Sequence, residues 1–258
     1  QTDEEFERIN TLLAEKCNAA RMPFQVGCSH MSPQISLERL RFALTLQPSA
    51  VQVILPDWFP PTLTECIRYL EVMAAAAGQV GLVLYNPPHA KKRLSPAEFG
   101  QILNPGIPLV GCKVPGGDAA WYAAMKAAAP QFSIFVPGHH LATGISLGAH
   151  GAYSNVACLH PLAAQQWYDA MLTDMGKALE LEKRIQLFMS RHIVPYITGQ
   201  GYANQAVDKL LAAVGGWADI GTRLRWPYES IHGQEIPTLR DACREILPEF
   251  CLDIQVNR

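Results

Sequence analysis

Residues 107–117 read Ile-Pro-Leu-Val-Gly-Cys-Lys-Val-Pro-Gly-Gly, so that Lys113 follows a short apolar run. An apolar run without polar alternation is typical of a strand that is buried on both faces of a parallel sheet. The proline and glycines after the lysine mark the turn that ends such a strand. The stretch therefore predicts a buried parallel strand with Lys113 at its carboxyl end.

Similar runs recur along the first two thirds of the chain, with helix-like segments between them. They are residues 23–28, 50–56, 80–88, 132–138 and 151–156. Strand–helix units that repeat at intervals of about 30 residues predict either a doubly wound sheet or a (β/α) barrel. No G-x-G-x-x-G motif follows any of these runs, which disfavours a dinucleotide-binding sheet.

The rest of the chain is predicted to be helical. We expect residues 1–162 to form the strand–helix units, equivalent to strands 3–8 of a barrel. Residues 163–258 are expected to form the last barrel helix and a helical extension of the same structural domain, with one long helix over residues 163–190. Because the sequence opens in a helix and shows only six strands, we expect the first one and a half units of the barrel to be missing from this chain.

Composition and charge disfavour several classes of function. The net charge of −2 and the isoelectric point near 6.5 provide no basic surface for nucleic acid or an anionic membrane. No apolar stretch reaches the length of about 20 residues that a membrane helix needs. The seven cysteines include no C-x-x-C pair, which disfavours zinc and a disulfide framework. We therefore expect a cytoplasmic protein that acts on small molecules.

Tyr85 ends the run at residues 80–88, one strand–helix unit before Lys113. Neighbouring parallel strands would bring both side chains to the same mouth of a barrel, where such enzymes keep their catalytic groups. A poorly solvated lysine supplies the free amine that attacks a carbonyl, and a phenol can relay protons. Taken alone, each residue more often has a plain structural role, as a strand-end lysine or a packed tyrosine. Together they predict a catalytic pair.

Four segments resemble consecutive landmarks of the dihydrodipicolinate synthase/N-acetylneuraminate lyase family. They are YNPP at 85–88, LVGCKVPGGD at 109–118, FVPGHH at 135–140 and GAHGAYSN at 148–155. The resemblance implies a (β/α)8 TIM barrel in which Lys113 holds pyruvate or a related 2-keto acid as a Schiff base and Tyr85 shuttles protons. It implies that the backbone of Tyr153 lies against the keto acid. It further implies no metal, no organic cofactor and a homo-oligomer, either a dimer or a tetramer.

The sequence departs from the synthase branch of that family at two places. Ala90 stands where the branch has an arginine that clamps the carboxylate of the second substrate, and Trp58 and Phe59 stand where it has a tyrosine pair. We therefore expect poor use of aspartate semialdehyde and better use of a less charged aldehyde. Trp58 either lines an apolar pocket for that aldehyde or packs in the core.

Further candidate substrate contacts are Gly138, His139 and Ser154. On an extended segment His139 and His140 would point to opposite sides, so that at most one faces the site. Asp118 is expected to cap the helix that follows it. Three functions stay open: a Schiff-base lyase or aldolase, a 4-hydroxy-tetrahydrodipicolinate (dihydrodipicolinate) synthase of lysine biosynthesis, and a non-catalytic keto-acid-binding relative.

Overall fold

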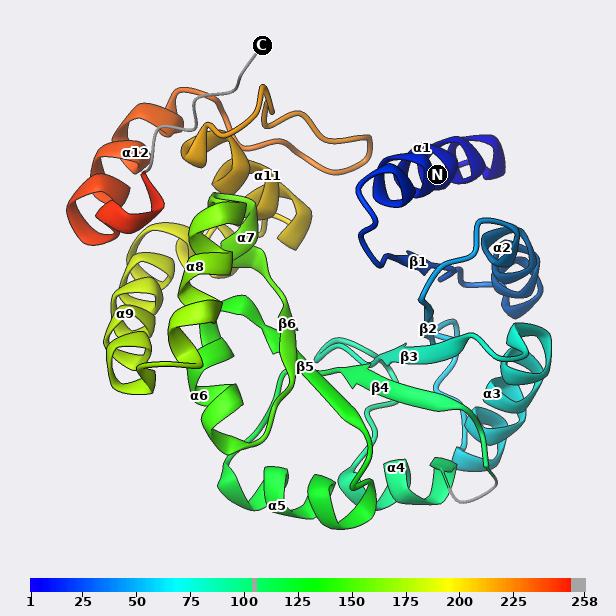
Figure 1. Cartoon of the computed structure of the whole chain (residues 1–258). Coiled ribbons are helices and arrows are strands. Elements are labelled where there is room, and N and C mark those ends of the chain that lie inside the picture. Colours follow the sequence, from blue (N-terminus) through cyan, green and yellow to red (C-terminus); the bar gives the residue numbers. More distant parts are fainter. Residues whose placement is uncertain (104–105, 252–258) are drawn as a thin grey trace. The chain divides into compact units, whose positions relative to one another are not determined.

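The computed structural model describes residues 1–103 and 106–251 (Figure 1). They divide into two compact units, with the boundary between Phe135 and Val136. The strands follow one another in chain order, and the six strand predictions are confirmed. They are β1 (Gln25–Gly27), β2 (Ala50–Ile54), β3 (Gly81–Tyr85), β4 (Leu109–Lys113), β5 (Ser133–Pro137) and β6 (Gly151–Tyr153).

The first unit alternates strands and helices, as the sequence predicts. Its ladders β1–β2, β2–β3, β3–β4 and β4–β5 are all parallel. Helix α2 packs against β2, and α3 packs against β3. The helices of this unit are α1 (Asp3–Ala19), α2 (Pro33–Thr45), α3 (Leu63–Ala77), α4 (Pro96–Leu103) and α5 (Ala119–Ala128). Asp118 caps α5 by accepting the N–H of Trp121 at 2.8 Å, which confirms the predicted cap.

The paired strands carry two different rows of side chains, because successive residues of a strand face opposite sides. One row is fully buried and consists of Val53, Leu84, Cys112 and Ile134. The next row is only half-buried and consists of Ile54, Tyr85, Lys113 and Phe135. The functional side chains of the strands therefore all project from one face, away from the buried row.

A β-bulge in β4 decides which residue belongs to which row. Leu82 pairs with Leu109, but Val83 pairs with Gly111, so the ladder passes over Val110. Val110 is 46% exposed, and a Cβ atom on Gly81 would come within 2.8 Å of its methyl carbons. The missing side chain at Gly81 thus makes room for the extra residue. An extra residue shifts the register by one position and turns every following side chain to the other face.

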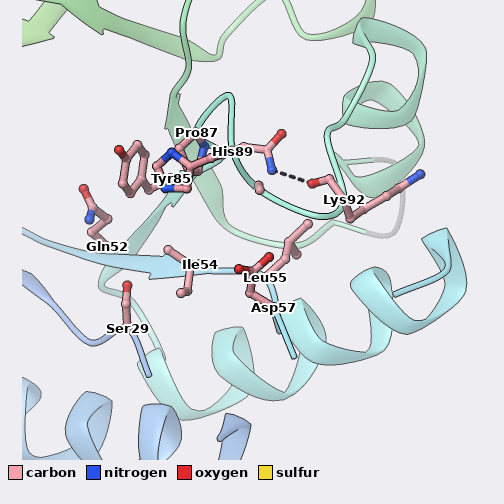
Figure 2. A pocket seen from close by; sticks show the side chains of 11 residues that line it. Ser29, Gln52, Ile54, Leu55, Asp57, Tyr85, Pro87, His89 and Lys92 are labelled. Carbon is pink, nitrogen blue, oxygen red and sulfur yellow. Dashed lines mark hydrogen bonds between the residues drawn. The ribbon is translucent and has the colours of Figure 1, made fainter. Parts of the chain in front are cut away.

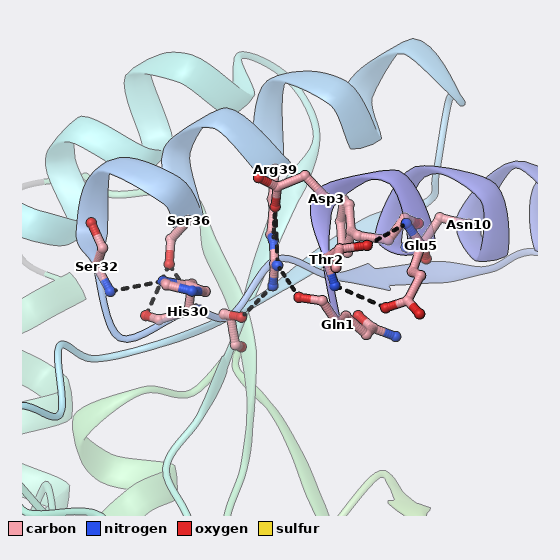
Figure 3. Close-up of polar contacts among 11 residues, drawn as sticks. Gln1, Thr2, Asp3, Glu5, Asn10, His30, Ser32, Ser36 and Arg39 are labelled. Carbon is pink, nitrogen blue, oxygen red and sulfur yellow. Dashed lines mark hydrogen bonds and ion pairs between the residues drawn. The ribbon is translucent and has the colours of Figure 1, made fainter. Parts of the chain in front are cut away.

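The loop after β1 is fixed by two side chains of α2 (Figure 3). The hydroxyl of Ser36 accepts the N–H of His30 at 3.0 Å and donates to the carbonyl of His30 at 3.2 Å. Arg39, only 8% exposed, donates to the carbonyl of Ser29 at 3.3 Å and pairs with Asp3 at 3.2 Å. The guanidinium therefore ties the start of α1 to the loop that carries Ser29.

The second unit is mainly helical. It contains β6, α6 (Leu141–Leu147), α7 (Asn155–Leu159), α8 (Pro161–Met171), α9 (Met175–Phe188), a π-helical turn (Met189–Ile193), α10 (Val194–Thr198), α11 (Asn204–Gly215) and α12 (Glu235–Ile246). The buried carboxylate of Glu182 on α9 accepts the N–H groups of Ala142 and Thr143 at the start of α6. This contact fixes α6 against α9, because a carboxylate satisfies the free N–H groups of a helix start.

The expectation of one long helix over residues 163–190 is wrong. The chain leaves the helical path after Met171, and α9 begins anew when Asp174 accepts the N–H of Lys177 at 3.0 Å. A short acidic side chain offers the backbone a cap that competes with a continuous helix. The division into residues 1–162 and 163–258 within one structural domain stays a prediction.

All seven cysteines are free thiols. Burial raises the pKa of Cys28 to about 12 and that of Cys66 to about 11, and it also raises the pKa of Cys112. Cys112 is buried, whereas Cys158 is only half-buried. No helix among the described residues is both long and apolar enough to cross a membrane.

Candidate active site

Tyr85 and Lys113 are direct partners in the β3–β4 ladder, at the carboxyl ends of both strands. The Nζ atom of Lys113 lies over the ring of Tyr85, 5.3 Å from the ring centroid. The partner of Lys113 on the other side is Phe135 of β5, so the lysine lies between two aromatic residues. The lack of a side chain at Gly111 lets β5 lie this close to β4. A Cβ atom on Gly111 would lie 2.6 Å from the carbonyl oxygen of Ser133 and 3.2 Å from the ring of Phe135.

A cavity of about 290 Å³ opens next to Tyr85 (Figure 2). Its wall combines residues of the paired strands with residues of the loops that follow them. The polar lining residues are Ser29, Gln52, Asp57, Tyr85, Asn86, His89 and Lys92. Ligand sites combine an apolar wall with a few polar groups in this way, and the volume suits a small molecule.

Asn86 fixes the loop that forms one side of the cavity. Its N–H donates to the carbonyl of Lys113 at 2.9 Å. Its side-chain amide donates to the carbonyl of Lys92 at 2.8 Å, and its side-chain oxygen accepts the N–H of Leu94 at 2.9 Å. The residue is only 4% exposed. Asn86 therefore links β4, the strand that carries Lys113, to both ends of the loop that carries His89.

The second unit brings the other predicted contacts together. A Cβ atom on Gly138 would lie 2.9 Å from the Cα atom of Ser154, so the two backbones touch. The hydroxyl of Ser154 accepts the N–H of Ala157 and caps α7. The N–H of His139 donates to the side-chain oxygen of Asn155 at 3.3 Å. Tyr153 ends β6, next to Ser154, and is half-buried.

The expectation that His139 and His140 point to opposite sides is wrong. Residues 138–140 form a 3-10 turn rather than an extended segment, and the two imidazole rings lie 4.2 Å apart. Three residues complete such a turn, so neighbouring side chains do not oppose each other. Within the described parts of the chain, no group of three or more His, Cys, Asp and Glu side chains is placed to hold a metal ion.

Trp58 does not pack in the core. Both Trp58 and Phe59 are 77% exposed, and neither lines the cavity. The neighbouring Asp57 lines it instead. A role for Trp58 in binding substrate stays a prediction.

Ser29, Gln52, Asp57 and Asn86 were missed by reasoning from the sequence. Asn86 lies within the YNPP motif next to Tyr85, and Asp57 directly precedes Trp58, so their place in the sequence was a usable signal. Gln52 is a polar residue inside an apolar strand, which is a weaker signal. Ser29 follows β1 with no pattern that distinguishes it from an ordinary turn serine.

The family model described as "Dihydrodipicolinate synthetase family" matches residues 4–245. Among curated proteins, the chain is similar to a 4-hydroxy-tetrahydrodipicolinate synthase of Thermomicrobium roseum, with 26% identity over 206 residues. This alignment covers 76% of the chain and 67% of that relative.

Solved structures share the fold. One is YagE, a prophage protein of E. coli K12 in complex with pyruvate, which superimposes with a TM-score of 0.81 at 20% identity. The superposition covers 95% of this chain and 82% of the YagE chain. N-acetylneuraminate lyase from Mycoplasma synoviae gives a TM-score of 0.74 at 19% identity, over 95% of this chain and 80% of its own. Since the family model spans nearly all of the described residues, the chain belongs to the dihydrodipicolinate synthetase family.

Proposed function

We propose that Lys113 forms a Schiff base with pyruvate or a related 2-keto acid and that the protein uses this adduct as a lyase or aldolase. The family consists of lyases that work through such a lysine and need no cofactor. The observation that supports Lys113 most directly is its register pairing with Tyr85, with the amine 5.3 Å from the ring centroid and the cavity beside the phenol.

The chemistry follows from the two side chains. The amine of Lys113 attacks the keto carbon and forms a carbinolamine, and loss of water from it leaves a C=N bond to the lysine. The resulting iminium accepts the electron pair of a breaking C–C bond, or of a C–H bond when an aldehyde is to be added. Tyr85 is placed to carry the proton that the carbinolamine gains and loses. The aromatic residues Tyr85 and Phe135 flank the lysine in the neighbouring strands.

Trapping by reduction tests the assignment. Incubation with pyruvate and borohydride should add one reduced pyruvyl group, which peptide mass spectrometry should locate on Lys113. The variant Lys113→Arg should give no adduct, whereas Lys126→Arg, which alters an exposed lysine near the end of α5, should give the full adduct. An adduct on another lysine contradicts the assignment, and absence of any adduct favours the non-catalytic alternative.

The backbone of Tyr153 is the proposed wall against the substrate, and Gly138, His139 and Ser154 are proposed neighbours. The close contact between Gly138 and Ser154 supports this grouping, because it holds the segments after β5 and β6 together. Replacing Gly138 by alanine should lower the yield of the trapped adduct.

The finer expectations about architecture and assembly also stay proposals. A closed (β/α)8 barrel needs two strands more than the six described here. A dimer or tetramer is the expected assembly, and a solved relative is called "the first monomeric dihydrodipicolinate synthase variant". Sedimentation equilibrium of the purified protein measures its assembly directly. A cytoplasmic location is likewise proposed.

A further inference from the structure

The cavity beside Tyr85 carries a negative charge that the residues around it do not neutralise. Asp57 is half-buried, and its Oδ1 atom accepts the backbone N–H of Lys91 at 3.0 Å. No salt bridge to Asp57 forms among the described residues. Its carboxylate therefore faces the cavity with one neutral donor and no cationic partner.

Both lysines of the adjacent loop are engaged elsewhere. The ammonium group of Lys91 donates to the carbonyl of Trp58 at 2.7 Å. That of Lys92 pairs with Glu98 at 2.5 Å, where both side chains are about one quarter exposed. Among the residues that the structure describes, no arginine lines the cavity. A carboxylate that entered would meet Asp57 without a cation to compensate, and like charges at short range in a partly desolvated site repel strongly.

Ser29 offers the same cavity an unused hydroxyl group. Its Oγ atom is buried and makes no hydrogen bond within the described chain, although Ser29 lines the cavity. The backbone around it is fixed, because Arg39 binds its carbonyl and Ser36 binds the next residue, His30 (Figure 3). A buried hydroxyl without a partner is unfavourable, so a fixed one that lines a cavity is suited to a ligand that bonds to it.

We propose that Asp57 and Ser29 select the second substrate: Asp57 excludes aldehydes that carry a carboxylate, and Ser29 hydrogen-bonds to an uncharged, hydroxyl-bearing aldehyde. Gln52 lies in the same wall and offers the aldehyde a further amide (Figure 2). The inference rests on the proposed function, since the aldehyde must react with the enamine held on Lys113. It assigns selection to residues that follow β1 and β2, and it accounts for the absence of a guanidinium from the cavity.

A matched pair of aldehydes tests the charge. Glyceraldehyde and tartronate semialdehyde differ only in their last carbon, which is a hydroxymethyl group in one and a carboxylate in the other. At pH 8 and at saturating pyruvate, the protein should prefer glyceraldehyde by kcat/KM. Asp57→Asn keeps the acceptor for the N–H of Lys91 but removes the charge, so it should reduce this preference at least about tenfold.

Two further variants separate the parts of the proposal. Asp118→Asn makes the same charge change outside the cavity and keeps a helix cap, so it should leave the preference unchanged. Ser29→Ala should lower kcat/KM for glyceraldehyde about tenfold by removing one hydrogen bond in a dry site. Asp57→Ser replaces Asp57→Asn if circular dichroism shows that the asparagine variant does not fold.

Trapping of pyruvate on Lys113 is measured for every variant and keeps the two proposals apart. If the wild type traps pyruvate but Asp57→Asn keeps the same preference, or neither aldehyde reacts, the inference is overturned and the proposed function stands. A wild-type preference for tartronate semialdehyde overturns the inference as well. If the wild type does not trap pyruvate, both proposals fall.

Discussion

Tyr85 lies opposite Lys113, and not opposite Cys112, because β4 contains one residue more than β3 between their paired ends. The extra residue is Val110, which the ladder passes over. If Val110 were paired with Val83, a continuous register from the Leu82–Leu109 pair would place Cys112 opposite Tyr85 and turn Lys113 toward the buried row. The proposed catalytic pair thus depends on a bulge that lies three residues before the lysine.

Deleting Val110 should leave Schiff-base formation intact. The ladder then runs without a bulge from the Leu82–Leu109 pair to the Tyr85–Lys113 pair, so the amine stays on the face that carries Tyr85. Val110→Ala keeps the residue count and should also trap pyruvate normally. The measurement is the mass of the borohydride-reduced adduct. A deletion variant that folds, as judged by circular dichroism, and no longer traps pyruvate would falsify the view that Val110 is an extra residue of the ladder.

Tyr85→Phe should lower turnover by roughly 10²–10⁴-fold, the usual contribution of a positioned acid–base group. The ring remains, so the thermal midpoint should change little. Tyr228→Phe removes the hydroxyl group from a side chain that is 58% exposed, and it serves as the control. Steady-state rates with saturating pyruvate check the prediction. Near-normal turnover of Tyr85→Phe would mean that the tyrosine serves only packing.

Ser29→Ala should make the ligand-free protein more stable, by about 1 kcal/mol, because it removes a buried hydroxyl without a partner. Ser36→Ala should do the opposite and lower stability by about 1–3 kcal/mol, since that hydroxyl makes two hydrogen bonds with His30. Thermal unfolding of both variants gives the comparison. Equal shifts of the two midpoints in the same direction would contradict the different bonding of these serines.

Asn86→Ala should raise the KM for the aldehyde and leave trapping of pyruvate largely intact. The loop that carries His89 loses both of its side-chain anchors, whereas the strands that pair Tyr85 with Lys113 remain. Hydrogen exchange reports the cause directly, because the N–H of Leu94 should exchange much faster once its acceptor is gone. Unchanged exchange at Leu94 would rule out this role for Asn86.

The ion pair between Lys92 and Glu98, at the end of the same loop, makes the stability of the protein depend on pH. The hydrogen bond from Lys92 lowers the pKa of Glu98 below its ordinary value of 4.5. A carboxyl group with a lowered pKa in the folded state contributes stability above its unfolded pKa and loses it as the pH falls through the folded pKa. Glu98→Gln should therefore flatten the loss of stability that sets in as the pH falls below the ordinary pKa of 4.5. Urea titrations at several pH values measure this slope, and an unchanged slope contradicts the prediction.

The strands and the Tyr85–Lys113 pair could be predicted from sequence because both follow from a repeat that Gly and Pro mark clearly. The bulge could not, since Leu109 and Val110 are equally apolar and an unalternating run contains no signal of register. The role of Ser29 was equally hidden, because it depends on which atoms remain without a partner after folding. The helix break was visible in part: Asp174 is a good capping residue, but the apolar periodicity around it suggested continuity.

The buried thiols of the protein bear on how its lysine can be labelled. The thiolate, not the thiol, reacts with electrophiles. Since burial raises the pKa of Cys66 to about 11 and that of Cys28 to about 12, at most about one such thiol in a thousand is ionised at pH 8. An electrophilic analogue of a keto acid, such as bromopyruvate, therefore meets little competition from these sulfur atoms. Covalent labelling of Lys113 should therefore be more selective in this chain than its seven cysteines suggest.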